Sequence, residues 1–304
     1  MSKKCLVIGG AGFIGSNLVD VLVEKGYSVR IIDDLSTGKL DNINHAADFV
    51  EADISEDGVE DTLSPYFDGA DYVFHLAAMA RVQPSIEDPV RYDAVNVGGT
   101  LRMLKLAADH NVEKFIFSSS SSVYGEPDYT PTDEEHPKNP MSPYAANKLI
   151  GEVYCKMFSE VYDLPTVCLR YFNVYGERQP LEGAYALVMG IFADKLLKGK
   201  PMTINGDGEQ RRDFTYVKDV VNANILAAES DDAGYGESYN VGNNDNRSVN
   251  QLADLLGGDR VTADPVIEPN ITLANNDKIS KVLGWKPTVV LDDWIPGWKK
   301  SIGL

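Results

Sequence analysis

The sequence predicts an α/β protein: a doubly wound parallel sheet followed by a smaller C-terminal lobe. Short apolar runs that suit buried strands alternate with amphipathic helical stretches over the first 175 residues, as in a parallel sheet with helices on both faces. A glycine-rich turn joins the first strand to the first helix. After residue 175 the alternation breaks. We therefore expect a sheet domain at 1–175 and a substrate-binding lobe at 176–304, with chain segments interleaved between them.

Composition and charge exclude several classes of protein. The 304 residues include 28 Lys and Arg against 46 Asp and Glu, a net charge of −18, so the surface repels nucleic acid and anionic membranes. The three cysteines and four histidines have no ligand spacing, which predicts neither a metal site nor a disulfide framework and favours a reducing compartment. The apolar run Cys5–Ile8 is too short for a signal peptide or membrane span. We expect a soluble, cytoplasmic protein.

The first strand, Cys5–Ile8, is followed at once by Gly9, Gly12 and Gly15 and then by a helical stretch. Glycines at this G-x-x-G-x-x-G spacing permit a tight turn, let a pyrophosphate reach the helix N-terminus and let the helix pack on the strand. Between a strand and a helix, the pattern indicates a Rossmann-type dinucleotide site.

The second strand, Ser28–Ile32, ends at Asp33, 18 residues after Gly15. A carboxylate at this strand end accepts hydrogen bonds from the adenosine ribose and repels a 2′-phosphate, so it favours NAD over NADP. The polar turn at 34–38 is suited to wrapping the ribose, and Asp53–Ile54 to framing the adenine.

Two further strands are expected at Tyr72–Ala78 and Lys114–Ser119, separated by a long helix from about Pro89 to Asn111. The first ends in small residues that leave room for a dinucleotide, and the second leads into Ser120. Because the carboxyl ends of parallel strands share one sheet edge, these ends should meet beside the glycine turn and Asp33.

Tyr144 and Lys148 lie one turn apart on a helix that starts at Pro143 and carries apolar residues every four positions. A tyrosine has an ordinary pKa near 10, and a nearby ammonium group favours its phenolate and lowers that pKa. The Ser120 hydroxyl can then pass a proton between a substrate alcohol and the phenolate. A Tyr-x-x-x-Lys pair on a helix is usually no more than a solvated surface pair. Here the surrounding motifs are what indicate a catalytic role for Tyr144 and Lys148.

Later segments break the β/α rhythm and predict a smaller lobe with helices and short strands of its own. The expected elements are a strand at Thr166–Arg170, a helix at Leu187–Leu197, a strand at Met202–Asn205, helices near Val217–Glu229, Asn250–Leu256 and Asp277–Leu283, and a tryptophan-bearing end with Trp285, Trp294 and Trp298.

Taken together, these motifs resemble the extended short-chain dehydrogenase/reductase superfamily, and within it the nucleotide-sugar 4-epimerases. The resemblance extends from Lys4 to about Lys300. It rests on the motifs GGAGFIGSNL, IDDLSTG, HLAA, NVGGT, FSSSSSVYG, SPYAANK, RYFNVYG, INGDGEQRRDFTYVKDV and LGWKP. The resemblance implies an NAD cofactor, a UDP-sugar substrate, the isomerase class, and a homodimer formed through helices around 90–110 and 144–162.

The resemblance also implies roles for individual residues, with Ser120, Tyr144 and Lys148 carrying the chemistry. The expected cofactor contacts are Gly9, Gly12, Phe13, Ile14, Gly15, Asp33, Asp34, Ser36, Thr37, Gly38, Asp53, Ile54, Leu76, Ala77, Ala78, Asn96, Ser118, Tyr144, Lys148 and Tyr171. The expected substrate contacts are Arg81, Ser120, Ser122, Tyr144, Asn173, Ala186, Thr203, Asn205, Arg212 and Thr272.

The serine run separates the reactions that such enzymes catalyse. Sugar 4,6-dehydratases place Thr-Asp-Glu where this chain has Ser120–Ser122, so the acid and base that eliminate water are missing. UDP-glucuronate decarboxylases usually show Thr-Ser-Glu in this region, and that glutamate is missing too. We therefore expect 4-epimerisation by transient oxidation at C4. The alternatives are another nucleotide-sugar enzyme, such as a UDP-glucuronate decarboxylase or epimerase or a reductase, and a non-catalytic NAD sensor. The intact Ser/Tyr/Lys set argues against the sensor.

Two departures from the family pattern affect the substrate site, and a third position, Thr272, bears on the choice of sugar. The stretch 263–276 holds no Arg or Lys where epimerases usually place a diphosphate arginine, so Arg212, with Arg211, Arg178 or Arg247, must supply that charge. Arg81 replaces a small residue and is either a substrate contact or surface charge. Thr272 stands where an aromatic residue excludes N-acetyl sugars, so we expect UDP-N-acetylglucosamine to be accepted; Ala184 and Ala186 are also small.

Overall fold

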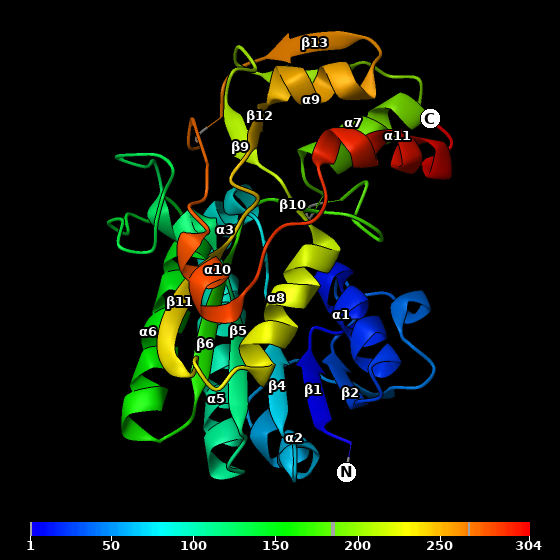
Figure 1. Cartoon of the computed structure of the whole chain (residues 1–304). Helices are drawn as coiled ribbons and strands as arrows, with labels where there is room; N and C mark the ends of the chain where they lie inside the picture. Colours follow the sequence, from blue (N-terminus) through cyan, green and yellow to red (C-terminus); the bar gives the residue numbers. More distant parts are fainter. Residues whose placement is uncertain (1, 184–185, 267) are drawn as a thin grey trace.

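The computed structural model describes residues 2–183, 186–266 and 268–304. Its centre is a seven-stranded sheet, in which every pair of neighbouring strands is parallel, in the order β11-β6-β5-β4-β1-β2-β3 (Figure 1). The strands are β1 Lys4–Ile8, β2 Ser28–Asp33, β3 Asp48–Glu51, β4 Tyr72–His75, β5 Lys114–Ser120, β6 Thr166–Tyr171 and β11 Tyr235–Val241. The predicted α/β class is confirmed. Strand order reverses between β1 and β4, where a ligand crevice is expected.

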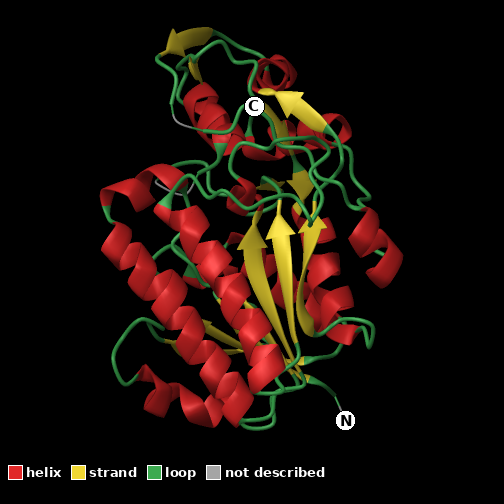
Figure 2. Cartoon of the chain, turned by 90° about the vertical axis from the view of Figure 1, so that its left-hand side faces the viewer, coloured by secondary structure: helices red, strands yellow, loops and turns green. Residues whose placement is uncertain are grey.

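Helices cover both faces of this sheet (Figure 2). One layer holds α1 (Phe13–Glu24) and α8 (Val217–Glu229), and the other holds α2 (Val59–Phe67), α5 (Thr100–Asp109) and α6 (Pro143–Val161). Successive residues of β1 alternate between the two apolar cores, with Val7 in one and Leu6 in the other. Burial on both faces explains why the strand is a continuous apolar run.

The chain returns to the sheet after residue 175, through α8 and the edge strand β11. The helix at 217–229, which we had assigned to the smaller lobe, packs instead on α1, β5 and β6. The edge strand β11 was not predicted, because its sequence YGESYNV has polar and glycine positions and a bulge between Tyr235 and Glu237. The division at residue 175 remains a proposal.

The expected helix at 89–111 is continuous but not uniform. It consists of α4 (Pro89–Asp93), a π-helical turn (Ala94–Gly99) and α5, which ends at Asp109. In the π turn the buried Asn96 side chain accepts a hydrogen bond from the Met79 amide (2.8 Å) and donates one to the Met79 carbonyl (2.9 Å). Such turns often orient a functional side chain. Here the two hydrogen bonds of Asn96 fix the loop after β4 at Met79.

A smaller lobe lies above the carboxyl ends of the strands and includes the C-terminus (Figure 1). Its helices are α7 (Val188–Leu197), α9 (Val249–Leu256) and α11 (Leu291–Ile302), and its strand pairs are β8 (Met202–Asn205) with β13 (Arg260–Ala263) and β9 (Arg211–Asp213) with β12 (Asn246–Ser248). The remaining α-helices and strands are α3 (Val82–Glu87), α10 (Asp277–Leu283), β7 (Val174–Tyr175) and β10 (Thr215–Tyr216). Trp285 is fully buried and donates its indole hydrogen to the Asp219 carbonyl (2.8 Å).

Within residues 2–183, 186–266 and 268–304, no helix has both the length and the apolar character needed to cross a bilayer. Helix α6 exposes Ile150, Val153 and Val161 on the face away from the sheet core. The expected homodimer through this region stays a prediction, which sedimentation of the purified protein would test.

Candidate active site

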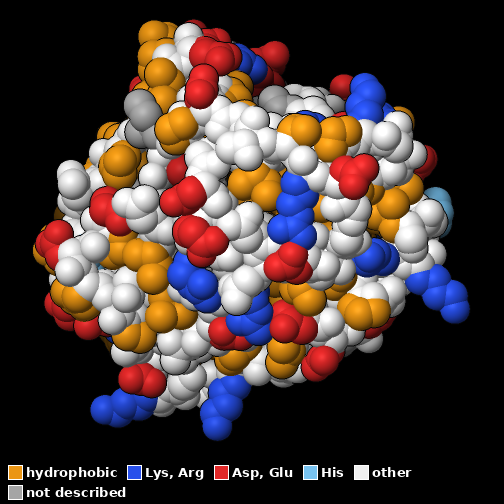
Figure 3. All heavy atoms as spheres, turned by 90° about the horizontal axis from the view of Figure 1, so that it is seen from above, with side chains coloured by type: hydrophobic (Ala, Val, Ile, Leu, Met, Phe, Trp, Pro, Cys, Tyr) orange, Lys and Arg blue, Asp and Glu red, His pale blue; other side chains and the backbone are white. Residues whose placement is uncertain are grey.

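One cavity of about 960 Å³ opens at the carboxyl ends of the strands and is lined by both the sheet domain and the smaller lobe. Gly9, Asp33, Ala77 and Ser120 all line it, so the four strand ends meet as the sequence predicted. Seen from above, lysines and arginines lie at separate places among acidic and apolar side chains, without a continuous basic patch on this face (Figure 3).

The cavity contains nearly every residue that the sequence assigned to a site. Gly38, Asn96 and Ala186 are the described residues of that set that do not line it. Gly38 backs Asp33, since a Cβ there would lie 2.6 Å from the Asp33 carboxylate, and Asn96 holds Met79. Ala186 is fully buried, and Ala184 lies outside the described residues. The sequence reasoning missed other lining residues, among them Gln179, Gln210 and Glu268.

The glycine turn leaves the N-terminus of α1 open toward this cavity. Gly12 is the N-cap of α1, and among the described residues no side chain caps the helix, so its first amides have no side-chain partner there. Gly15 packs against the turn so closely that a Cβ would lie 2.0 Å from the Gly9 carbonyl oxygen. Free amides and the positive end of the helix dipole suit a pyrophosphate group, so the turn fits the dinucleotide expected from the sequence.

Asp33 joins the glycine turn to the turn that follows β2. Its carboxylate oxygens accept hydrogen bonds from the amides of Ala11 (2.9 Å) and Leu35 (2.9 Å). Burial raises the pKa of Asp33, and these two amide hydrogen bonds act against that rise. Each carboxylate oxygen has a further lone pair, so the group can still accept a ribose hydroxyl.

Tyr144 and Lys148 stand in the first two turns of α6. Ser142 caps this helix by accepting a hydrogen bond from the Ala145 amide (3.2 Å), and Pro143 takes the first helical position. The Lys148 ammonium donates to the Ser118 carbonyl (2.7 Å) and lies 6.0 Å from the centre of the Tyr144 ring. Burial lowers the pKa of Lys148 to about 8.

The ionisation of Tyr144 differs from our expectation. We expected Lys148 to lower the pKa of Tyr144, but that pKa is raised, because burial of the phenol is the largest influence. A hydrogen bond with Ser120 is the group's one opposing influence, and it lowers the pKa. Ser120 is therefore the residue that favours the phenolate here, while Lys148 is turned toward the β5 backbone.

Tyr171 belongs to a buried chain of hydrogen bonds that the sequence did not reveal. Its hydroxyl lies 3.0 Å from the Ser118 hydroxyl and accepts from the Asn224 amide (2.8 Å), and burial raises its pKa to about 12. Asn224 comes from α8, more than fifty positions away in the chain, so no local pattern could have indicated it. These hydrogen bonds hold Tyr171 at the cavity wall, where its hydroxyl meets that of Ser118, the residue whose carbonyl accepts from Lys148.

Among the described residues of the smaller lobe, Arg212 is the arginine that lines the cavity. Its guanidinium pairs with the Glu268 carboxylate (2.6 Å) and donates to the Arg211 carbonyl (2.8 Å). Arg211, Arg178 and Arg247, which we had considered for the same task, bond to Asn246, Asp20 and Asp292 respectively, and none of the three lines the cavity. The charge offered to a diphosphate by this lobe thus comes from Arg212.

Asn173 and Thr272 meet where the two lobes join. The Asn173 amide donates to the Asp213 carbonyl (3.0 Å) and to the Thr272 hydroxyl (3.4 Å), which also accepts from the Asp213 amide (3.1 Å). Both residues line the cavity, as expected, and Thr272 presents a small side chain to it.

Comparison of the chain with known proteins identifies its family. The model of the NAD dependent epimerase/dehydratase family matches residues 5–242. The chain belongs to this family. Membership confirms the resemblance expected from the sequence, the NAD cofactor and the enzyme class, an epimerase.

Individual relatives of the family cover nearly the whole chain. A putative UDP-glucose 4-epimerase of Methanocaldococcus jannaschii is 41% identical, over 97% of this chain and 98% of its own. The structure of UDP-glucose 4-epimerase from Thermotoga maritima with UDP-glucose is 38% identical, covers 98% of this chain and 99% of its own, and has a TM-score of 0.91. UDP-N-acetylglucosamine 4-epimerase from Methanobrevibacter ruminantium, in complex with UDP-N-acetylmuramic acid, is 38% identical with a TM-score of 0.89, covering 99% and 97%.

The Asp33 carboxylate leads us to expect that the purified protein carries NAD rather than NADP. The carboxylate repels a 2′-phosphate, and Leu35–Thr37 holds no basic residue to offset that repulsion. We expect denatured protein to release NAD, measured by chromatography of the supernatant, and the apoprotein to bind NAD more tightly than NADP. Release of NADP alone, or tighter binding of NADP, would contradict the assignment of Asp33.

Proposed function

We propose that this protein is a UDP-hexose 4-epimerase that interconverts UDP-glucose with UDP-galactose, and UDP-N-acetylglucosamine with UDP-N-acetylgalactosamine. One observation carries the proposal. Ser120, Tyr144 and Lys148 line the same cavity as the open helix N-terminus of α1 and Asp33, so a proton relay lies where a dinucleotide can be held. The names of the compared relatives support uridine as the base and C4 as the reacting carbon.

The site residues suit proton transfer at a sugar hydroxyl. The glycine turn at the N-terminus of α1 and Asp33 would hold NAD, which when bound would supply the hydride acceptor and donor for C4. Tyr144 accepts the proton of the 4-hydroxyl through Ser120, whose hydrogen bond already favours the phenolate, and returns a proton to the new alcohol. Lys148, held by the Ser118 carbonyl, places a positive charge beside the tyrosine ring. The net redox change is zero, so no second substrate is needed.

The lining carboxylates argue against elimination as the main reaction. Asp33, Asp34 and Asp53 belong to the β2 and β3 ends, and Glu268 is engaged by Arg212. The residues that follow β5 offer hydroxyls only, Ser121 and Ser122. A dehydratase needs an acid and a base beside C5 and C6, which this arrangement does not supply.

Incubation with UDP-glucose, UDP-N-acetylglucosamine and UDP-glucuronate, followed by NMR of the products, tests the proposal. We expect the galacto-configured epimer at equilibrium, with no added reductant. Accumulation of a 4-keto-6-deoxy sugar or of a pentose would show a dehydratase or a decarboxylase instead. Binding of NAD with no turnover of any UDP-sugar would favour a sensor.

Sugar choice depends on Thr272 in this proposal. Thr272→Tyr fills the cavity beside the sugar, so we expect it to lower kcat/KM for UDP-N-acetylglucosamine relative to UDP-glucose, by about 10–200-fold. Kinetics with both sugars measure the ratio. Because Thr272 also bonds Asn173 and Asp213, Thr272→Val is the matched control: it removes the hydroxyl at constant size and should leave the ratio nearly unchanged. An unchanged ratio in Thr272→Tyr would exclude Thr272 as the gate.

A further inference from the structure

The ammonium group of Lys148 lies over the face of the Phe117 ring. Its Nζ is 5.0 Å from the centre of that ring and 6.0 Å from the centre of the Tyr144 ring. A cation within about 6 Å of an aromatic ring centre is attracted by the negative face of the ring. Phe117 is almost fully buried and does not line the cavity, so any effect that it has on the site passes through Lys148.

Lys148 has few other partners for its charge. Its ammonium has three donors, and within residues 2–183, 186–266 and 268–304 one hydrogen bond engages them, to the Ser118 carbonyl (2.7 Å). Glu152, one turn further along α6, is held by Arg170 through contacts of 2.8 Å and 2.6 Å. Burial lowers the pKa of Lys148 to about 8. The positive charge is therefore weakly held, and a single aromatic ring can change how much of it remains near neutral pH.

Two neighbours fix the Phe117 ring in this place. His75, at the end of β4, stacks on the ring with centres 6.0 Å apart and planes 16° apart. Gly151 of α6 faces the far end of the ring so closely that a Cβ there would lie 2.3 Å from the Phe117 Cζ. Glycine weakens a helix interior, so the room that the ring needs explains its presence here. Because Gly151 and Lys148 are three positions apart and share a helix face, the ring that packs on one also meets the other.

The imidazole of His75 does not compete with Lys148 as a cation on this ring. The Thr100 hydroxyl donates to the Asn96 carbonyl (2.7 Å), so its oxygen accepts a hydrogen bond from the His75 Nε2 (2.9 Å). This assigns the hydrogen of the imidazole to Nε2. Burial lowers the pKa of His75 to about 3, so the imidazole is neutral. Among the described residues, Lys148 is the cation that lies over the Phe117 ring.

We propose that Phe117 is a positioning residue of the active site, whose ring face keeps the Lys148 ammonium charged and beside Tyr144. The effect on the reaction rests on the proposed function, whereas the contact between ring and ammonium does not. The attraction comes from the negative charge on the ring face, so it depends on the electron density of the ring and not only on its size.

The usual strength of such contacts sets the size of the expected effect. Loss of a cation–π contact should lower the pKa of Lys148 by about 0.4–1.5. Starting from about 8, this brings the pKa close to neutral, so part of the Lys148 population loses its charge at pH 7. The other ionisable groups near Lys148 are Tyr144, Cys155 and Glu152 of α6 and His75 of β4. A change confined to the Phe117 ring leaves all four in place.

The test follows the titration of Lys148 by NMR in protein that contains isotope-labelled lysine, with the signal identified by its loss in Lys148→Arg. Replacing Phe117 by mono-, di- and trifluorinated phenylalanine withdraws electrons from the ring face and hardly changes its size. We expect the pKa of Lys148 to fall stepwise along this series. Phe115 is the matched control, because it is equally buried on β5 and packs against His75 at 5.7 Å. The same series at Phe115 should leave the titration of Lys148 unchanged.

Initial rates with UDP-glucose connect the contact to the reaction. Since the charged form of Lys148 is the active one, kcat should fall in the order of the Lys148 pKa, by up to about 4-fold at pH 7 and about 16-fold at pH 8. KM should stay nearly constant, because Phe117 does not line the cavity. A purely structural role for Phe117 would not give a graded response to fluorination.

Three results would overturn the proposal. The first is a Lys148 pKa that the trifluorinated ring leaves unchanged, in a variant whose thermal unfolding matches the wild type. The second is an equal fall of that pKa along the Phe115 series. The third is a pKa that falls while kcat at pH 8 stays at the wild-type level, which would show that the contact does not serve the reaction. If no UDP-sugar is epimerised, the proposed function fails, and the titration still decides whether the ring holds the charge.

Discussion

Tyr144→Phe is expected to lower kcat for the epimerisation by about 10²–10⁴-fold or more, because it removes the group that exchanges a proton with the sugar hydroxyl. The change deletes one oxygen and leaves the ring in place, so we expect the variant to retain its NAD. Initial rates with UDP-glucose and the NAD released on denaturation measure both properties. Near-normal activity in this variant would rule out the assignment of Tyr144.

Two further variants show whether the effect belongs to the hydroxyl of Tyr144. Tyr154→Phe removes a hydroxyl from the same helix, outside the cavity lining, and should keep the wild-type rate. Ser120→Ala removes the hydrogen bond that lowers the pKa of Tyr144. Activity that needs the phenolate rises with pH through that pKa, so Ser120→Ala should move this rise to higher pH. A rise that stays in place would show that Ser120 does not act on Tyr144.

Glu152→Ala is expected to destabilise the fold by about 3–5 kcal/mol, because it leaves the charge of Arg170 buried and uncompensated. The Arg170 guanidinium meets the Glu152 carboxylate through two contacts, of 2.6 Å and 2.8 Å, and both side chains are almost fully buried. The same carboxylate accepts a hydrogen bond from Ser119, one residue before Ser120. Loss of Glu152 therefore also loosens the end of β5.

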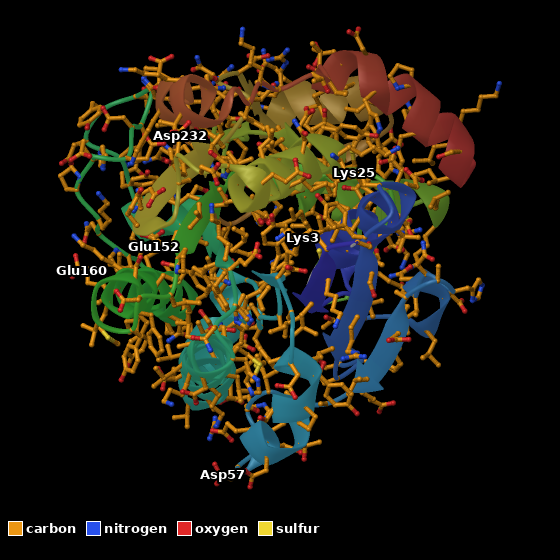
Figure 4. The ribbon with its side chains drawn as sticks, turned by 60° about the horizontal axis from the view of Figure 1, so that its bottom comes forward. Lys3, Lys25, Asp57, Glu152, Glu160 and Asp232 are labelled. Atoms are coloured by element: carbon orange, nitrogen blue, oxygen red, sulfur yellow. The ribbon has the colours of Figure 1, made fainter. Side chains whose placement is uncertain are left out.

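Urea unfolding compares this variant with two matched ones. Glu160→Ala lies on the same helix, where Glu160 is exposed beside Lys156 at 3.8 Å, and an exposed pair contributes about 0–1 kcal/mol (Figure 4). Replacing Glu152 and Arg170 together by methionine should cost much less than Glu152→Ala, since no lone charge remains. Equal losses for Glu152→Ala and Glu160→Ala would show that the buried pair does not stabilise the protein.

The sequence by itself determined the features that depend on neighbours close along the chain. The Gly9, Gly12 and Gly15 turn, the acid at the end of β2 and the Tyr144–Lys148 spacing follow from strand and helix periodicity. Parallel strands then bring their carboxyl ends to one edge whatever the details of packing. This is why most predicted site residues line one cavity.

Only the tertiary structure decided which distant groups meet. Glu268 lies 56 positions from Arg212, and Asn224 lies 53 from Tyr171, so neither partner is visible in a local pattern. The tertiary structure also turned Lys148 toward the Ser118 carbonyl and brought β11 back to the sheet edge. The reason is physical: the pKa of a buried group depends on what surrounds it in space, and burial is what raises the pKa of Tyr144 despite the nearby lysine.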